Sequence, residues 1–241
     1  MSSNIIQTSR EGDIAIITID RPAEGNMLTA EMLGELSAAF RRVGETDAKA
    51  VVLRSTGPDF CRGRDVKGAR PAPTALAVRE SVVTPLLDVY DSMANTPQPI
   101  VGAVQGRALG FGCALATACD ITIAADNARF RLPELEKNLP PTLAISAMMA
   151  RVHRKALTWM VYSMEEIDVR TAWDVGIVSK VVAADQIGGS VAELTSLLTA
   201  RSRDALVAVK DYLRSAPMME PRGAADYAGN LLCAVLSSAG R

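Results

Sequence analysis

The segment VGAVQGRALGFGCALATACDITIAADNARF, residues 101–130, is the most informative part of this chain. It begins as an apolar strand and then places two glycines, Gly110 and Gly112, ahead of a small apolar run that ends at Asp120. Glycine between a strand and a helix allows the backbone to approach another segment or a ligand closely. Because the run has few reactive side chains, chemistry here must use main-chain amides or side chains from elsewhere in the fold.

Nucleotide binding is the first interpretation of such glycines, but the sequence argues against it. Gly110 and Gly112 follow a predicted strand, as in the dinucleotide-binding fingerprint, but Leu115 stands where that fingerprint needs Gly or Ala. The chain also lacks the G-x-x-x-x-G-K-S/T phosphate loop. The glycines instead favour a backbone N–H that stabilises negative charge on a substrate, with a second N–H from the loop at residues 61–65.

Strands and helices alternate on both sides of this segment. Apolar and β-branched runs predict strands at residues 13–20, 50–55, 100–104, 121–125 and 177–182, and an extended stretch at 130–135. Helical spacing predicts helices from Thr29 to Val43 and at residues 75–93, 143–154, 171–175, 184–201, 202–215 and 222–238. We therefore predict an α/β core over residues 1–183 and a helical C-terminal region over residues 184–241.

Composition restricts the class of protein. The 241 residues are 49% apolar and 22% charged, as in soluble globular proteins, and 26 basic against 27 acidic residues leave a net charge of −1. Without a basic field, neither nucleic acid nor an anionic membrane is an expected partner. The first residues lack the pattern of a secretory signal and no run approaches the length of a membrane span, so we expect a cytoplasmic protein.

The cysteines and the histidine do not form a recognisable site. Cys61, Cys113, Cys119 and Cys233 lack the spacing of a zinc or redox motif, and His153 is the only histidine. We expect reduced thiols, with Cys113 and Cys119 in the core, a surface position for His153, and no metal site.

Four segments, in one order, resemble the crotonase superfamily of enoyl-CoA hydratases and isomerases. They are ITIDRPAEGNMLTAEMLGEL (17–36), FCRGRDVK (60–67), the segment 101–130 and IDVRTAWDVGIVSKVV (167–182). The second is similar to the family's F-C-x-G-x-D-L/I-K loop, and the third to its A-x-x-G-x-A-x-G-G-G-x-x-L-A-x-x-C-D block. Four matches in register are specific, although each one alone is weak. The resemblance implies a crotonase-like α/β spiral of ββα units, with C-terminal helices that build homotrimers or hexamers.

The resemblance also implies an oxyanion hole. In that family two backbone amides hold the thioester carbonyl oxygen, and the matching positions in this chain are Arg64 and Phe111. Both side chains are larger than the usual small residue, but the hole tolerates them because the donors are main-chain groups. One such donor is worth about 10²- to 10³-fold in rate.

Hydratases of the family carry two catalytic glutamates, and this chain matches one of them. Ala114 occupies the first position, whereas Glu134, within Pro133-Glu134-Leu135, matches the second. One base is enough to shift a double bond, because it can take a proton from C2 of a 3-enoyl thioester and return it at C4. The resemblance therefore implies an enoyl-CoA isomerase with Glu134 as general acid/base. Glu136 is a weaker substitute for that role.

The same resemblance implies further substrate-binding positions. It implies substrate contacts at Ala23, Glu24, Arg62, Asp65, Val66, Gly110, Ala114, Pro133 and Leu139. Basic residues that can meet the phosphates of coenzyme A are Arg62, Arg64, Lys67 and Arg70, and a solvated charge cluster is the alternative for them. The acyl-CoA substrate carries its own coenzyme A, so no separate cofactor is expected.

Three other functions stay open on sequence alone. They are an enoyl-CoA hydratase, another crotonase reaction such as thioester hydrolysis or decarboxylation, and a non-catalytic acyl-CoA-binding paralogue. These alternatives stay open because the chain departs from the family pattern at three places. The departures are Ala114, the bulky Arg64 and Phe111, and the segment 138–142, which replaces the P-G-A-G-G turn typical of hydratases.

Overall fold

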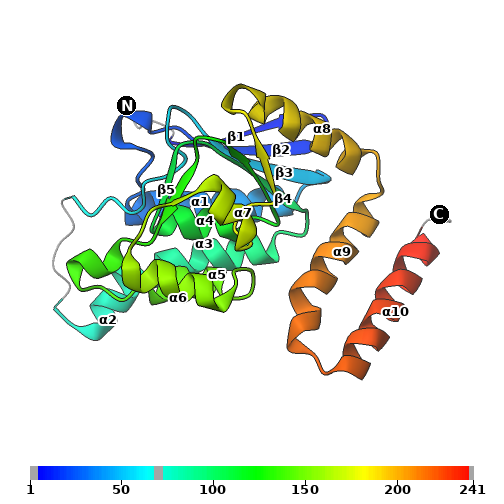
Figure 1. Cartoon of the computed structure of the whole chain (residues 1–241). Coiled ribbons are helices and arrows are strands. Elements are labelled where there is room, and N and C mark those ends of the chain that lie inside the picture. Colours follow the sequence, from blue (N-terminus) through cyan, green and yellow to red (C-terminus); the bar gives the residue numbers. More distant parts are fainter. Residues whose placement is uncertain (1–4, 68–72, 239–241) are drawn as a thin grey trace.

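The larger of two sheets holds six strands in the order β1-β2-β3-β4-β6-β9 (Figure 1). The computed structural model describes residues 5–67 and 73–238. Only the pair β1–β2 is antiparallel, and the other neighbours run parallel. The bounds are β1 (Ile6–Glu11), β2 (Ile14–Ile19), β3 (Ala50–Ser55), β4 (Ile100–Val104), β6 (Ile121–Ala125) and β9 (Lys180–Val182). Parallel neighbours need long crossovers, which here contain the helices.

A second sheet of three short strands continues from the first. Its strands are β5 (Arg107–Leu109), β7 (Arg129–Arg131) and β8 (Ile167–Asp168), in the order β5-β7-β8. β5 follows β4 directly and β7 follows β6, and β5 and β7 pair in parallel. The pairs β4–β5 and β6–β7 therefore each place one strand in each sheet, whereas β1 and β2 both lie in the large sheet. Figure 1 shows this arrangement, with the helices packed around both sheets.

The helices cover both faces of the main sheet. Helices α1, α3 and α4 pack on one face, and α8 contacts β3, β4 and β6 on the other (Figure 1). The bounds are α1 (Ala30–Gly44), α2 (Ala75–Val78), α3 (Thr84–Asn95), α4 (Phe111–Ala118), α5 (Thr142–Met148), α6 (Arg154–Ser163), α7 (Val169–Asp174), α8 (Ile187–Thr199), α9 (Arg203–Ser215) and α10 (Pro221–Ser238). A π-helical turn (Arg79–Val83) joins α2 to α3, and short 3₁₀ turns lie at Pro22–Glu24, Glu134–Lys137, Ala184–Gln186 and Ala216–Met218.

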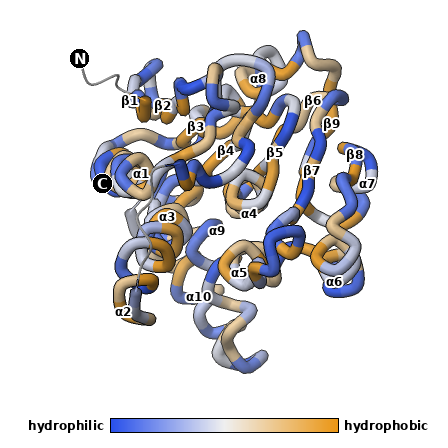
Figure 2. The backbone as a smooth tube through the Cα atoms, turned by 90° about the vertical axis from the view of Figure 1, so that its left-hand side faces the viewer, coloured by the Kyte–Doolittle hydropathy of each residue, from blue (hydrophilic) through white to orange (hydrophobic). Residues whose placement is uncertain are grey.

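The apolar core lies between the sheet and the helices α1, α3 and α4. Ile17, Leu53 and Ile100 on the strands are fully buried, as are Phe40 on α1 and Leu115 on α4. In Figure 2 the central strands and α4 carry mainly apolar residues, whereas the outer helices alternate between apolar and polar ones. Burial of this apolar surface is the main stabilising contribution to the fold.

Several predicted elements are confirmed. β3, β4 and β6 match the predicted strands residue for residue, and α1 begins where Thr29 accepts a hydrogen bond from the amide of Met32 at 3.4 Å. The predicted C-terminal helices appear as α8, α9 and α10. The crotonase-like spiral is confirmed as the fold class, while the division into residues 1–183 and 184–241 stays a prediction.

Other elements differ from the predictions. β1 was not predicted because five of its six residues are exposed, which leaves too little apolar alternation. The predicted helix at 143–154 is shorter, and α6, which follows it, was missed. The predicted extended stretch at 130–135 is also wrong in its second half. After β7 the chain turns at Pro133 into a 3₁₀ turn that begins at Glu134.

A buried lysine connects α9 to the core. The Nζ atom of Lys210 lies 2.8 Å from the carboxylate of Asp120 and donates hydrogen bonds to the carbonyl oxygens of Met93 and Gln98, both at 3.1 Å. Three oxygen partners compensate the loss of hydration that burial of this charge causes. Asp120 also accepts a hydrogen bond from the amide of Ile100 at 2.8 Å, so this carboxylate connects α9 to the start of β4. Within the described residues, no helix has the length and apolarity needed to cross a bilayer.

Candidate active site

The site forms where the loop after β3 meets the start of α4. The amide of Cys61 donates to the carbonyl of Arg107 at 3.1 Å, and the amide of Leu109 donates to the carbonyl of Cys61 at 2.9 Å. Gly112 then brings α4 against this loop, since a Cβ at Gly112 would lie 1.9 Å from the Cys61 carbonyl oxygen. Any other residue would force the two backbones apart.

Two backbone amides are left without a partner at this junction. Leu28 pairs with the residues on both sides of Arg64: its amide donates to Gly63, and its carbonyl accepts the amide of Asp65. The amide of Arg64 therefore points away from that pair and has no acceptor among the described residues. Phe111 is the first residue of α4, where helix amides lack intrahelical acceptors and the helix dipole favours negative charge. Both predicted oxyanion amides are thus available.

Glu134 lies directly beside the second amide. Its Oε1 atom would be 2.7 Å from a Cβ at Gly110, the residue that precedes Phe111. Gly110 also has a φ of +53°, which favours glycine. The other oxygen, Oε2, is buried and has no hydrogen-bond partner among the described residues. Burial raises the pKa of the Glu134 carboxyl above its ordinary value, which suits a general base.

The first glutamate position of the family offers no carboxylate here. Ala114 lies on the first turn of α4, is fully buried, and donates its amide to Gly110 at 3.1 Å. Glu136 does not compensate for this loss, because it is exposed and pairs with Arg131. Glu134 is therefore the carboxylate that the structure brings to the start of α4, beside the Phe111 amide.

Tyr90 is a residue of this site that sequence analysis missed. It lies on α3, and its ring stacks on Phe111 with centroids 5.9 Å apart and an interplanar angle of 28°. Burial, and then the charge of Glu134, raise the pKa of the Tyr90 hydroxyl, so the phenol stays protonated. Tyr90 shares the apolar spacing of Leu86 and Met93 on its helix, so the sequence alone carries no signal that separates it from core residues.

The cysteines near the site are unsuited to nucleophilic catalysis. Burial raises the pKa of Cys61 to about 12 and raises that of Cys113 as well, with a further contribution from Glu134 to Cys113. Both thiols therefore remain protonated at neutral pH and are unreactive. The expected core positions of Cys113 and Cys119 and the surface position of His153 are confirmed.

The predicted substrate-binding residues divide into two groups. Gly110, Ala114 and Pro133 lie at the junction described above. Exposed positions around it are Ala23, Glu24, Arg62, Val66, Lys67 and Leu139, and Arg70 falls outside the described residues.

Asp65 and Arg64 have contrasting environments. Asp65 is buried and pairs with Arg21 at 2.8 Å, and the pKa of Asp65 is lowered by hydrogen bonds from the amide of Lys67 and from Arg21. It therefore holds the loop in place, and its role as a substrate contact stays a prediction. The Arg64 side chain is half-buried, and its Nε atom has no hydrogen-bond partner among the described residues.

Comparison with known proteins agrees with this geometry. The profile of the enoyl-CoA hydratase/isomerase family matches residues 9–230. The chain belongs to the enoyl-CoA hydratase/isomerase family. The 2,3-dehydroadipyl-CoA hydratase of Escherichia coli is 32% identical over 211 residues, which are 86% of this chain and 80% of that protein. The short-chain-enoyl-CoA hydratase of Clostridium acetobutylicum is 27% identical over 213 residues, 87% of this chain and 80% of that one.

A solved structure is similar over nearly the whole chain. The enoyl-CoA hydratase of Mycobacterium smegmatis superposes with a TM-score of 0.91 and 27% identity, and covers 96% of this chain and 91% of its own. The predicted crotonase resemblance is confirmed, and with it an acyl-CoA enzyme family. The relatives named here are hydratases, so the predicted preference for isomerase is not supported by these comparisons.

The close approach at Gly112 makes a direct prediction. Gly112→Ala should destabilise the protein by about 1–3 kcal/mol, because the added methyl overpacks the junction with Cys61. The control is Gly188→Ala on α8, where a Cβ meets nothing within 4 Å and the helix should gain up to about 1 kcal/mol. Urea unfolding curves measure both, and equal stability of the two variants would contradict the assigned contact.

Desolvation of Glu134 predicts a pH-dependent stability. Its raised pKa means that the folded state binds this proton more tightly than the unfolded chain, so ionisation costs stability as the pH rises above about 4.5. Glu134→Gln should therefore be more stable than the wild type at about pH 8 and nearly equal to it at about pH 4. Thermal melts over this range measure the effect. Glu136→Gln, which removes an exposed ion pair with Arg131, should show no such gain.

Proposed function

We propose that this protein converts enoyl-CoA thioesters through an enolate, with Glu134 as the proton carrier and the amides of Arg64 and Phe111 as the oxyanion hole. The observation that carries the proposal is the desolvated Glu134 carboxylate beside the start of α4, next to an unpaired amide. Because the substrate brings its own coenzyme A, this chemistry requires no separate cofactor.

A shift of the double bond is the reaction that these groups perform most simply. Glu134 takes a proton from C2 of a 3-enoyl thioester, and the C–H electrons move to the carbonyl oxygen, where the two amides stabilise the enolate. The carbonyl is then restored, and the enolate π electrons form the new double bond between C2 and C3. The former C3=C4 π electrons take the proton from Glu134 at C4, which gives a 2-enoyl thioester. No second acid or base is needed, in agreement with Ala114.

Hydration of a 2-enoyl thioester is the second candidate. It is favoured by the relatives from E. coli and C. acetobutylicum, which are both named hydratases. Hydration requires a water molecule that is held in position while Glu134 removes one of its protons. In hydratases of the family the first glutamate shares that task, and Ala114 cannot.

The activity test uses matched 3-enoyl- and 2-enoyl-CoA substrates of the same chain length. Conversion of the 3-enoyl form to the 2-enoyl form supports isomerisation, and appearance of 3-hydroxyacyl-CoA supports hydration. Glu134→Gln should lower kcat by about 10²- to 10⁴-fold in either case, because it removes the proton carrier. Glu136→Gln is the matched control and should retain activity. Tight acyl-CoA binding without turnover would instead identify a non-catalytic binding protein.

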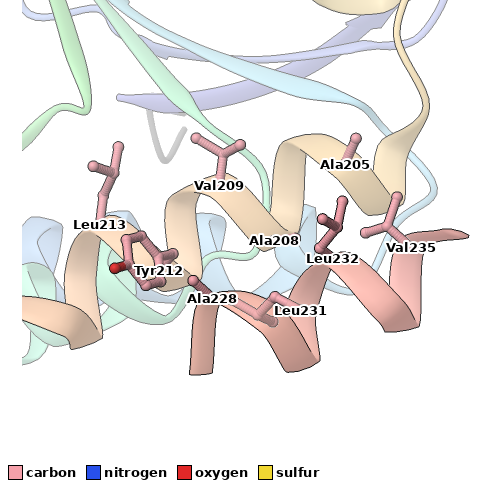
Figure 3. A pocket seen from close by; sticks show the side chains of 9 residues that line it. All are labelled: Ala205, Ala208, Val209, Tyr212, Leu213, Ala228, Leu231, Leu232 and Val235. Carbon is pink, nitrogen blue, oxygen red and sulfur yellow. The ribbon is translucent and has the colours of Figure 1, made fainter. Parts of the chain in front are cut away.

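We also propose that the chain forms a homotrimer or a dimer of trimers through its C-terminal helices. α9 and α10 form a hairpin that projects from the body of the protein (Figure 1). Apolar side chains between them line a cavity of about 330 Å³ (Figure 3). Among these, Val209, Leu213 and Leu232 are 59%, 69% and 59% exposed. Exposed apolar surface of this kind is typical of a subunit contact. The cytoplasmic location stays a prediction.

Light scattering after size exclusion tests the assembly. The wild type should have three or six times the 25.6 kDa mass of the chain. Leu232→Glu should shift it toward the monomer, because a charge buried in an apolar interface costs several kcal/mol. Leu197→Glu, an equally exposed leucine on α8, is the control and should leave the assembly intact. A monomeric wild type contradicts the proposed assembly.

A further inference from the structure

The side chain of Tyr90 comes to the site from α3. Its ring is fixed by the stack on Phe111, the residue whose amide belongs to the proposed oxyanion hole. Burial, and then the charges of Glu134, Cys113 and Cys61, raise the pKa of the Tyr90 hydroxyl. α3, the helix that carries Tyr90, contacts both α4 and α5.

Two polar side-chain atoms of the site lack hydrogen-bond partners among the described residues. The Glu134 Oε2 atom is buried without a hydrogen bond, and the Tyr90 hydroxyl makes none with any described residue. Ala114, Cys113 and Phe111 on the first turn of α4 are all buried. Buried polar atoms are nearly always satisfied, so a small polar molecule is expected at the Glu134 Oε2 atom, with the Tyr90 hydroxyl free to bind it as well.

We propose that Tyr90 holds the water that Glu134 activates, so that this single-carboxylate site hydrates 2-enoyl thioesters as well as shifting double bonds. The inference rests on the proposed enolate chemistry at Glu134. It assigns to Tyr90 the task of holding the water, which Ala114 cannot perform. The phenol takes the place that the first glutamate has in the two-carboxylate hydratases of the family.

The proton balance of the step is complete with these two side chains. The water donates one hydrogen bond to Glu134 and the other to the Tyr90 hydroxyl oxygen. As the water oxygen bonds to C3, Glu134 takes the first proton and the C2=C3 π electrons move to the thioester carbonyl as an enolate. Glu134 then delivers that proton to C2. The second water proton stays on the new C3 hydroxyl, and Tyr90 remains protonated throughout.

The chemistry of the neighbouring side chains favours Glu134 as the base and Tyr90 as the group that holds the water. A phenol with a raised pKa does not compete with Glu134 as a base, and it still accepts a hydrogen bond through its oxygen. The two neighbouring thiols, Cys61 and Cys113, are protonated and are weak hydrogen-bonding groups. Tyr90 is therefore the side chain of this site that can orient a water without removing its proton.

Binding of the hydration product tests the contact without turnover. The C3 hydroxyl of a 3-hydroxyacyl-CoA occupies the place of the water, so Tyr90→Phe should weaken its binding by about 2- to 12-fold, as expected for one lost hydrogen bond. Binding of the saturated acyl-CoA of the same length should not change. Titration calorimetry in a Glu134→Gln background measures both. Equal losses for the two ligands, or none, would overturn the proposal.

Turnover gives the second readout. Tyr90→Phe keeps the ring and its stack on Phe111, so the fold should be preserved, and Tyr162→Phe, at a 75% exposed residue on α6, is the control. Hydration should fall by about 10- to 100-fold, as for a misplaced nucleophile, and by clearly more than isomerisation of the 3-enoyl form, which uses no water. A wild type that isomerises without hydrating would overturn this inference alone. A wild type inactive on both substrates would overturn the proposed function, while the binding experiment still tests Tyr90.

Discussion

The backbone contact between Gly112 and the carbonyl of Cys61 is the constraint on which the site depends. It brings the start of α4 to the loop after β3, at a distance that no side chain allows. The amides of Arg64 and Phe111 are left without a backbone acceptor, because the residues around Arg64 pair with Leu28 and Phe111 is the first residue of α4. A chain without this contact would keep its sheet but lose the paired donors. The site is thus built mainly from backbone geometry, which explains why Arg64 and Phe111 can replace smaller residues.

The second feature of the site is a carboxylate with few stabilising partners. Glu134 is held beside Gly110 by the 3₁₀ turn that follows β7, with one oxygen buried and unpaired. This position costs stability and raises the pKa of the group, as is common where a side chain must exchange protons. The charge of Glu134 also acts on the Tyr90 hydroxyl, to which we assign the water of the proposed hydration step.

Several polar contacts attach the C-terminal helices to this core. Lys210 of α9 pairs with Asp120, which directly follows α4, and with two carbonyl oxygens at the end of α3 and before β4. The apolar side chains of α9 and α10 largely face each other and solvent (Figure 3). Arg203 and Arg214 of α9 also donate hydrogen bonds, to the carbonyl oxygen of Thr46 at 3.3 Å and to Asn95 at 2.8 Å. The hairpin is therefore positioned by several polar contacts, and its exposed apolar face is the surface of the proposed subunit contact.

The sequence alone determined the family and the positions of the buried strands β3, β4 and β6, and it proposed the residues of the oxyanion hole. These follow from local patterns: apolar runs, glycines at close approaches, and motifs whose spacing is preserved. It also identified Glu134 and the absence of a partner at Ala114. Only the tertiary structure decided which side chains share the site with Glu134, because that depends on contacts between segments far apart in the chain. Tyr90 has the apolar spacing of a core residue. Its location near the site follows only from the packing of α3 against α4. The missed edge strand β1 has the same cause, since an exposed strand is defined by its pairing with β2 and not by its own pattern.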